Sequence, residues 1–184
     1  YFVLYDRFLK SIGETYILES WDRVQRATDF DEIKIIGEQI PQSSNPFFVV
    51  INDRQGHQLF SGLASTPTIN ERTKKTSLLL KDYLTLLNSD ILVDWDSFTG
   101  STVADFINFI FDVWKQQIDV GFDRIDCDTT SIADKILDKA IYSFSGKKSI
   151  LAYTLIADII NFYDLYVEEK LDLKNKKLTF YFKK

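Results

Sequence analysis

The sequence predicts an α+β protein in two parts: a small β-barrel or sandwich over residues 1–93, then a helix–strand–helix–hairpin part over residues 94–184. Short apolar runs separated by Gly, Pro and Asn fill the first part, which is typical of strands and turns. Apolar residues at helical spacing occur only in the second part. With 184 residues, 45% of them hydrophobic and 15% aromatic, the chain has ample material for a packed core.

The first part is expected to be a succession of short strands. Phe47–Ile51 is a continuous apolar run, which suits a strand buried on both faces and followed by a hairpin turn through Gly56. The other expected strands are Tyr5–Leu9 before a turn at Gly13, the Ser20–Arg26 strand that carries Trp21, Ile33–Ile40, His57–Ser65 and Thr68–Leu80.

The second part begins with a helix signal. Thr102-x-x-Asp105 has the form of a capping box, in which a hydroxyl and a carboxylate bind the free backbone N–H groups of a helix start. Apolar residues then follow helical spacing to Ile118, and Gly121 is expected to end the helix. The next expected elements are a strand over Ile136–Phe144 and a helix from Ser149 to about Phe162.

The chain closes on a predicted β-hairpin. Leu165, Val167, Leu171 and Leu173 alternate with charged residues, and Leu178, Phe180 and Phe182 alternate again after the Lys174–Lys176 turn. Both preceding helices carry only a narrow polar stripe, so each needs cover on more than one side. That cover comes either from the strands of the same chain or from another subunit.

The net charge of −5 argues against nucleic-acid binding as the main function. It is also unevenly placed: Asp94–Asp138 holds ten acidic and three basic residues, whereas residues 139–184 hold nine Lys and five acidic residues. Acidic and basic faces can attract neighbouring copies in a ring, but two solvated faces are the better explanation for most of these charges.

Three acidic residues offer the strongest metal-like pattern. Asp123, Asp126 and Asp128, followed by Thr129 and Thr130, supply oxygen ligands of the kind that Ca²⁺ prefers. The spacing lacks the glycine and the distal glutamate of an EF-hand loop, so a solvated acidic loop is favoured and no metal site is predicted.

No catalytic constellation is evident, and the chain is predicted not to be an enzyme. Asp94 and Asp96 flank Trp95, and their side chains lie on the same face if this segment is extended. Paired carboxylates can do acid–base work, but a chance pair is the better explanation here. His57, the only histidine, is expected in a surface turn. Cys127 lies among carboxylates that raise its pKa and disfavour a thiolate nucleophile. No Gly-rich loop predicts a phosphate or cofactor site.

Membrane insertion and disulfide formation are also not predicted. No run of 18 apolar residues or signal-peptide pattern occurs, and a single Cys cannot form an intrachain disulfide. Since the sequence contains no Met, we expect it to be a piece of a longer polypeptide.

Several short phrases together resemble the siphophage tail-hub proteins, the N-terminal part of tail-associated or baseplate-hub chains. These phrases are Tyr5–Gly13 (Tyr-Asp-Arg…Ile-Gly), Ser20–Arg26 with its Trp, Phe144–Ser149 before an apolar helix, and Leu171–Phe180 (Leu-Asp-Leu-x-Asn-Lys-x-Leu-x-Phe). The acidic Asp119–Asp128 stretch departs from the family pattern.

The resemblance implies barrel-like β domains with inserted helices, three copies of which form a ring at the tip of a tail tube. Such a hub is similar to that of contractile-tailed phages. It joins the tube to the spike or fibre, contacts other tail or baseplate proteins, and leaves a path for DNA that is not specifically bound. The expected location is the virion, after synthesis in the bacterial host cytoplasm, with no membrane contact and no cofactor.

Two other functions stay open. A monomeric carbohydrate- or receptor-binding module would use exposed aromatic residues such as Trp21, Trp95 or Tyr181. A hydrolase would use Asp94 and Asp96 or the Asp123–Asp128 group. The three hypotheses differ in oligomeric state, ligand binding and turnover.

Overall fold

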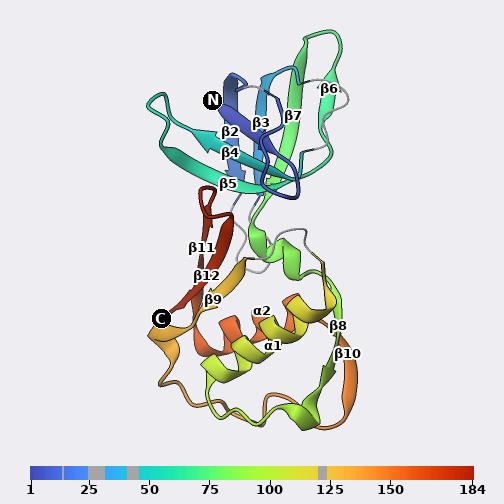
Figure 1. The fold of residues 1–184 in the computed structure, drawn as a ribbon, viewed down its shortest axis with the longest axis vertical. Coiled ribbons are helices and arrows are strands. Elements are labelled where there is room, and N and C mark those ends of the chain that lie inside the picture. Colours follow the sequence, from blue (N-terminus) through green and yellow to red (C-terminus); the bar gives the residue numbers. More distant parts are fainter. Residues whose placement is uncertain (14, 25–31, 41–45, 120–123) are drawn as a thin grey trace. The chain divides into compact units, whose positions relative to one another are not determined.

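The computed structural model describes residues 1–13, 15–24, 32–40, 46–119 and 124–184, and these divide into two compact units (Figure 1). Unit 1 covers Tyr1–Thr85 and is built on strands. Unit 2 covers Leu86–Lys184 and combines two helices with two small sheets. The described chain is therefore α+β. Its contacts divide between residues 85 and 86, ahead of the boundary after residue 93 that the sequence predicts.

Unit 1 contains one sheet in the strand order β1-β4-β5-β7-β3-β2, with β6 paired to β7 beside it. All of these pairings are antiparallel. The strands are β1 (Phe2–Tyr5), β2 (Leu18–Val24), β3 (Glu32–Glu38), β4 (Phe48–Asn52), β5 (Gln58–Ala64), β6 (Thr68–Asn70) and β7 (Lys75–Lys81).

The predicted barrel is wrong for the described residues, because the strand order is open, with β1 and β2 at its two ends. Two isolated bridges, Phe2–Tyr16 and Tyr5–Ser11, link β1 to the segment between β1 and β2. The core forms on one face of the sheet, where alternate residues of β3 and β7 such as Ile33, Ile35 and Leu78 are buried.

Two strand boundaries in unit 1 also differ from expectation. The expected Tyr5–Leu9 strand is a turn instead, because Asp6 Oδ1 accepts hydrogen bonds from the backbone N–H groups of Phe8 and Lys10. The expected Thr68–Leu80 strand is the β6–β7 hairpin. Asn70 Oδ1 accepts from two N–H groups in its turn, a local bond that competes with a continuous strand.

Unit 2 places helices α1 (Val103–Gln117) and α2 (Ala152–Tyr163) side by side between two sheets (Figure 1). One sheet pairs β8 (Asp90–Asp94) with β10 (Lys147–Leu151). The other has the order β11-β12-β9, from β11 (Tyr166–Asp172), β12 (Lys177–Lys183) and β9 (Ile125–Asp128). Three short 3₁₀ helices complete the described elements: η1 (Tyr83–Leu87), η2 (Trp95–Ser97) and η3 (Thr130–Ile132).

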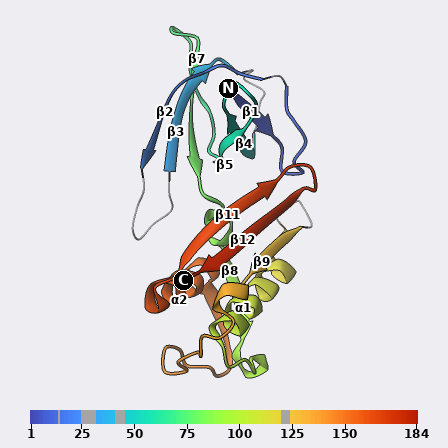
Figure 2. The ribbon, with the colours of Figure 1, turned by 90° about the vertical axis from the view of Figure 1, so that its left-hand side faces the viewer.

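The predicted capping box and terminal hairpin are confirmed. Thr102 Oγ1 accepts from the backbone N–H of Asp105 at 3.0 Å, and the Asp105 carboxylate accepts from the backbone N–H of Thr102 at 2.9 Å. The helix ends at Gln117, and Gly121 lies outside the described residues. Figure 2 shows the β11–β12 hairpin with the short β9 beside β12, which pairs with it in parallel.

The expected strand over Ile136–Phe144 is wrong, since only Ile136 forms a bridge, to Thr102, and a turn follows at Asp138. The second helix starts later than Ser149, because Lys147–Leu151 pairs with β8 first. Within unit 2 the helices find cover on both sides: Phe111 of α1 packs on Phe180 and Phe182 of β12, while α1 also contacts β8.

Candidate functional site

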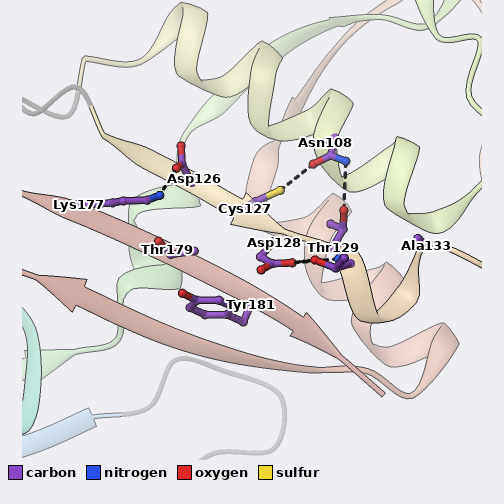
Figure 3. Close-up of a pocket in the computed structure, with 10 residues that line it drawn as sticks. Asn108, Asp126, Cys127, Asp128, Thr129, Ala133, Lys177, Thr179 and Tyr181 are labelled. Atoms are coloured by element: carbon purple, nitrogen blue, oxygen red, sulfur yellow. Dashed lines mark hydrogen bonds and ion pairs between the residues drawn. The ribbon is translucent and has the colours of Figure 1, made fainter. Parts of the chain in front are cut away.

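A polar groove of about 480 Å³ lies along β9 and β12 in unit 2 (Figure 3). It forms where β9 joins the terminal hairpin, with Asp126 opposite Thr179 and Asp128 opposite Tyr181 in the parallel register. Because side chains alternate between the faces of a strand, these four share the face opposite Phe180 and Phe182. The other lining residues are Asn108, Cys127, Thr129, Thr130, Ala133 and Lys177.

Charges in the groove are paired within it. Lys177 Nζ lies 2.6 Å from Asp126 Oδ2, which raises the pKa of Lys177. Asp128 accepts hydrogen bonds from the side chain and the backbone N–H of Thr130, and these bonds lower the pKa of its carboxyl group. Both carboxylates are therefore engaged within the groove, Asp126 by an ion pair and Asp128 by hydrogen bonds.

Cys127 lies on the side of β9 that faces α1. Its Sγ donates to Asn108 Oδ1 at 2.9 Å, and Asn108 Nδ2 donates to Thr129 Oγ1 at 3.2 Å. Burial raises the pKa of the Cys127 thiol to about 12, and the carboxylates of Asp112, Asp126 and Asp128 add to the shift. The predicted rise is confirmed, with burial as the larger cause, and the thiol is unsuited to nucleophilic attack at neutral pH.

Asp123, Asp126 and Asp128, which were considered as calcium ligands, are not all among the described residues. Asp123 lies outside the described residues, and Asp126 and Asp128 belong to strand β9. Across the described chain, no group of three or more His, Cys, Asp or Glu side chains is arranged to hold a metal ion.

Asp94 and Asp96 both hold the start of β10. Asp94 lies 3.5 Å from Lys147 Nζ, and Asp96 Oδ1 accepts from the backbone N–H of Gly146 at 3.1 Å. The chain turns into η2 at Trp95, so the extended segment that would place both carboxylates on one face does not occur. His57 lies in the β4–β5 turn with its side chain 73% exposed, as expected, and its ring nitrogen contacts Asp53.

The three aromatic residues considered for ligand binding differ in exposure. Trp95 is only 3% exposed, because it packs in a cluster with Phe98, Phe106, Phe109, Tyr142 and Phe144, so its expected exposure is wrong. Tyr181 lines the groove and is partly covered. Trp21 is 50% exposed at the sheet edge in unit 1.

The acidic and basic halves of unit 2 face each other within the chain. Lys177–Asp126, Lys184–Asp134 and Lys147–Asp94 join them at 2.6, 2.8 and 3.5 Å. Exposed ion pairs of this kind contribute little to stability. They nevertheless show that some of these opposite charges meet within the folded chain.

Sequence reasoning did not identify the groove, because β9 was not expected as a strand. The sequence of β9, Ile-Asp-Cys-Asp, is short and acidic, and its partner β12 lies some fifty residues further along the chain. Only the alternation of Ile125 and Cys127 with Asp126 and Asp128 marks the strand locally.

Comparison with known proteins gives a likeness in fold to a solved structure. No family model matches the chain, and no curated protein matches it in sequence. Among solved structures, the E. coli c3393 protein superposes over 94% of this chain with a TM-score of 0.56 and 8% identity. That protein is described as a component of the type VI secretion system with structural similarity to the T4 bacteriophage tail proteins gp27 and gp5.

The chain spans about half of that protein, since the match covers 47% of its length. At 8% identity the likeness concerns the fold alone. This chain therefore shares the fold of a secretion-system component that is structurally related to phage tail proteins.

Proposed function

We propose that this chain is a structural component of a bacteriophage or prophage tail tip, where it forms a trimeric hub that joins the tail tube to distal tail-tip or fibre proteins. The single observation that carries the proposal is the fold likeness to the type VI component related to gp27 and gp5, over 94% of the chain. The short sequence phrases that resemble siphophage tail hubs point the same way. The proposed location is the virion.

A non-enzymatic role is part of this proposal. Asp94 and Asp96 are engaged in holding Gly146 and Lys147, and the pKa of Cys127 lies far above neutral pH. These side chains support folding, as expected of an assembly protein. The net charge of −5 supports a path along which DNA passes without being held. Within the described residues, no helix is long and apolar enough to span a membrane.

The first test is the absolute mass of the purified chain by light scattering, over a range of protein and salt concentrations. A trimer supports the hub. The second test expresses a tagged chain in the bacterium that makes the particle and purifies its tails. Recovery of the tag in intact tails, at one end by electron microscopy, supports the proposed location, and a tag found only in the soluble fraction contradicts it.

A monomeric carbohydrate- or receptor-binding module is the second candidate, favoured by the exposed Trp21. Aromatic rings of this kind are common anchors at binding surfaces. This function predicts a monomer that binds glycans saturably and loses binding in Trp21→Ala. A trimer with no glycan binding excludes it.

A further inference from the structure

The groove along β9 and β12 contains a covered hydroxyl group that has no partner in the described chain. Thr179 is only 8% exposed and lines the groove from the middle of β12, opposite Asp126. Its side chain has no hydrogen-bond partner among the described residues, and no dashed line reaches it in Figure 3. A hydroxyl that leaves water without gaining a hydrogen bond costs folding free energy. The groove therefore holds a binding group that folding does not use.

A second hydroxyl lies beside it on the same face of β12. Tyr181 stands two residues after Thr179 and opposite Asp128, so its Cα lies about 7 Å from that of Thr179. In the part of the chain that the structure describes, no hydrogen bond reaches the Tyr181 hydroxyl, and its partly covered side chain lines the groove. One strand thus presents two free hydroxyls and an aromatic ring in a row.

The neighbouring strand β9 supplies acceptors. Asp126 uses Oδ2 for its ion pair with Lys177, and Asp128 uses Oδ1 for its bonds from Thr130. Within the described residues the second oxygen of each carboxylate has no hydrogen bond. A carboxylate oxygen only accepts, whereas a hydroxyl both donates and accepts, so the groove offers both kinds of bond. The contacts that hold the two carboxylates fix their positions before a ligand arrives.

Charge and size limit the kind of ligand. Asp126, Asp128 and Lys177 are the charged side chains that line the groove, and Lys177 is already paired with Asp126. An anionic ligand would be repelled by the two carboxylates, and a cationic one would compete with Lys177 for them. The volume of about 480 Å³ is typical of small-molecule sites, and the lining from Lys177 to Tyr181 follows about 13 Å of strand. An uncharged, elongated ligand rich in hydroxyl groups fits these limits.

We infer that this groove binds a neutral oligosaccharide of two or three hexose units. Hydroxyl groups of the sugar donate to the free oxygens of Asp126 and Asp128. They also exchange hydrogen bonds with Thr179 and Tyr181, whose hydroxyls thereby gain partners. The ligand thus completes the hydrogen bonding that the fold leaves open in the groove.

The site is separate from the structural role proposed for the chain. The groove is built from unit 2 alone and needs no second copy, so a monomer and a hub would both carry it. It also differs from the binding surface considered around Trp21, which lies in unit 1. The inference therefore adds a ligand to the chain without depending on its oligomeric state.

The test follows the amide signals of the whole chain by nuclear magnetic resonance during titration with neutral probes. These probes are maltotriose, cellotriose and triacetylchitotriose, and trilysine and trigalacturonate serve as the cationic and anionic comparisons. We expect saturable shifts of the β9 and β12 amide signals with at least one neutral probe. Absence of a saturable shift with every neutral probe, or shifts with a charged probe alone, overturns the inference.

Two substitutions test the hydroxyl groups. Thr179→Val and Tyr181→Phe remove them with little change of shape, and each is expected to weaken binding of the same probe about tenfold. Both variants should be as stable as wild type in chemical unfolding, because neither hydroxyl has a hydrogen bond within the described residues. Tyr166→Phe is the matched control, since it removes a hydroxyl from the same hairpin outside the groove and should bind like wild type.

The outcomes separate this site from the functions proposed above. Unchanged binding in both groove variants overturns the site, and so does loss of binding in Trp21→Ala, which would assign the sugar to unit 1. A trimer that binds none of the neutral probes overturns the site and leaves the hub standing. A monomer whose groove binds a probe leaves the site standing and contradicts the hub.

Discussion

Gln117 binds both backbone groups of Leu92, at 2.8 and 2.9 Å, across the last turn of α1 and the middle of β8. These two hydrogen bonds join α1 to β8 and cover one edge of the two-stranded β8–β10 sheet. Leu92 itself is 54% exposed, so this edge would otherwise be open to solvent beside an apolar side chain. The carboxamide therefore covers an edge of β8 with which no strand of the described chain pairs.

Replacing Gln117 with Ala should therefore destabilise unit 2 by about 1 kcal/mol, the usual net value of such hydrogen bonds. The Leu92 amide should also exchange its hydrogen faster. Urea unfolding and hydrogen exchange measure the two effects. Gln116→Ala, on the neighbouring exposed position, is the control. Equal stability and equal Leu92 exchange in both variants would contradict a structural role for the carboxamide.

The parts of the fold that the sequence predicts well depend on contacts between near neighbours. The α1 start follows from Thr102 and Asp105, which lie three residues apart, and the terminal hairpin from strict alternation on both sides of a short turn. Each signal is complete within about fifteen residues of chain.

The parts it misses depend on partners far along the chain. Lys147–Leu151 precedes a helix and resembles its first turn, yet pairing with β8 some fifty residues earlier makes it a strand. Trp95 stands between two aspartates, which suggests exposure, but Phe106 and Tyr142 cover it. The groove has the same origin, because β9 becomes a strand only when β12 lies beside it.

The capping box should contribute measurably to stability. Thr102→Ala removes the acceptor for the Asp105 N–H and is expected to cost about 1 kcal/mol. Thr102→Ser keeps the hydroxyl and should stay close to wild type. Chemical unfolding of both variants makes the comparison. A Thr102→Ser variant as unstable as Thr102→Ala would assign the loss to the methyl group instead.

Asp105 should also make stability depend on pH. Hydrogen bonds from the backbone N–H groups of Ser101 and Thr102 lower the pKa of its carboxyl group below the ordinary value of 3.8. Because the folded pKa is the lower one, the contribution is present above pH 4 and is lost as the pH falls through the folded pKa. Thermal unfolding between pH 2 and 7 should show that Asp105→Asn loses less stability at acid pH than wild type does. Parallel curves would contradict this assignment.

Cys127 should resist thiol reagents in the folded chain. With its pKa raised to about 12, the thiolate is scarce at pH 8, and labelling should be slower than in the unfolded chain on the order of a thousandfold. Stopped-flow labelling with and without urea measures the ratio. Asn108→Ala removes the acceptor of the thiol hydrogen bond and should raise the native rate by opening this side of β9. Fast labelling of the native wild type would show that burial does not protect the thiol.

Trp95 and Trp21 should differ in how much they contribute to the free energy of unfolding. Trp95 is 3% exposed and stacks on Phe106 and Tyr142 at 6.0 and 6.1 Å, so Trp95→Ala leaves a cavity and should cost about 3–5 kcal/mol. Trp21 is half exposed, and Trp21→Ala should change the free energy of unfolding by only about 0.5 kcal/mol. Denaturant unfolding of a dilute monomer measures both. A loss of stability in Trp21→Ala as large as that in Trp95→Ala would contradict this difference in burial.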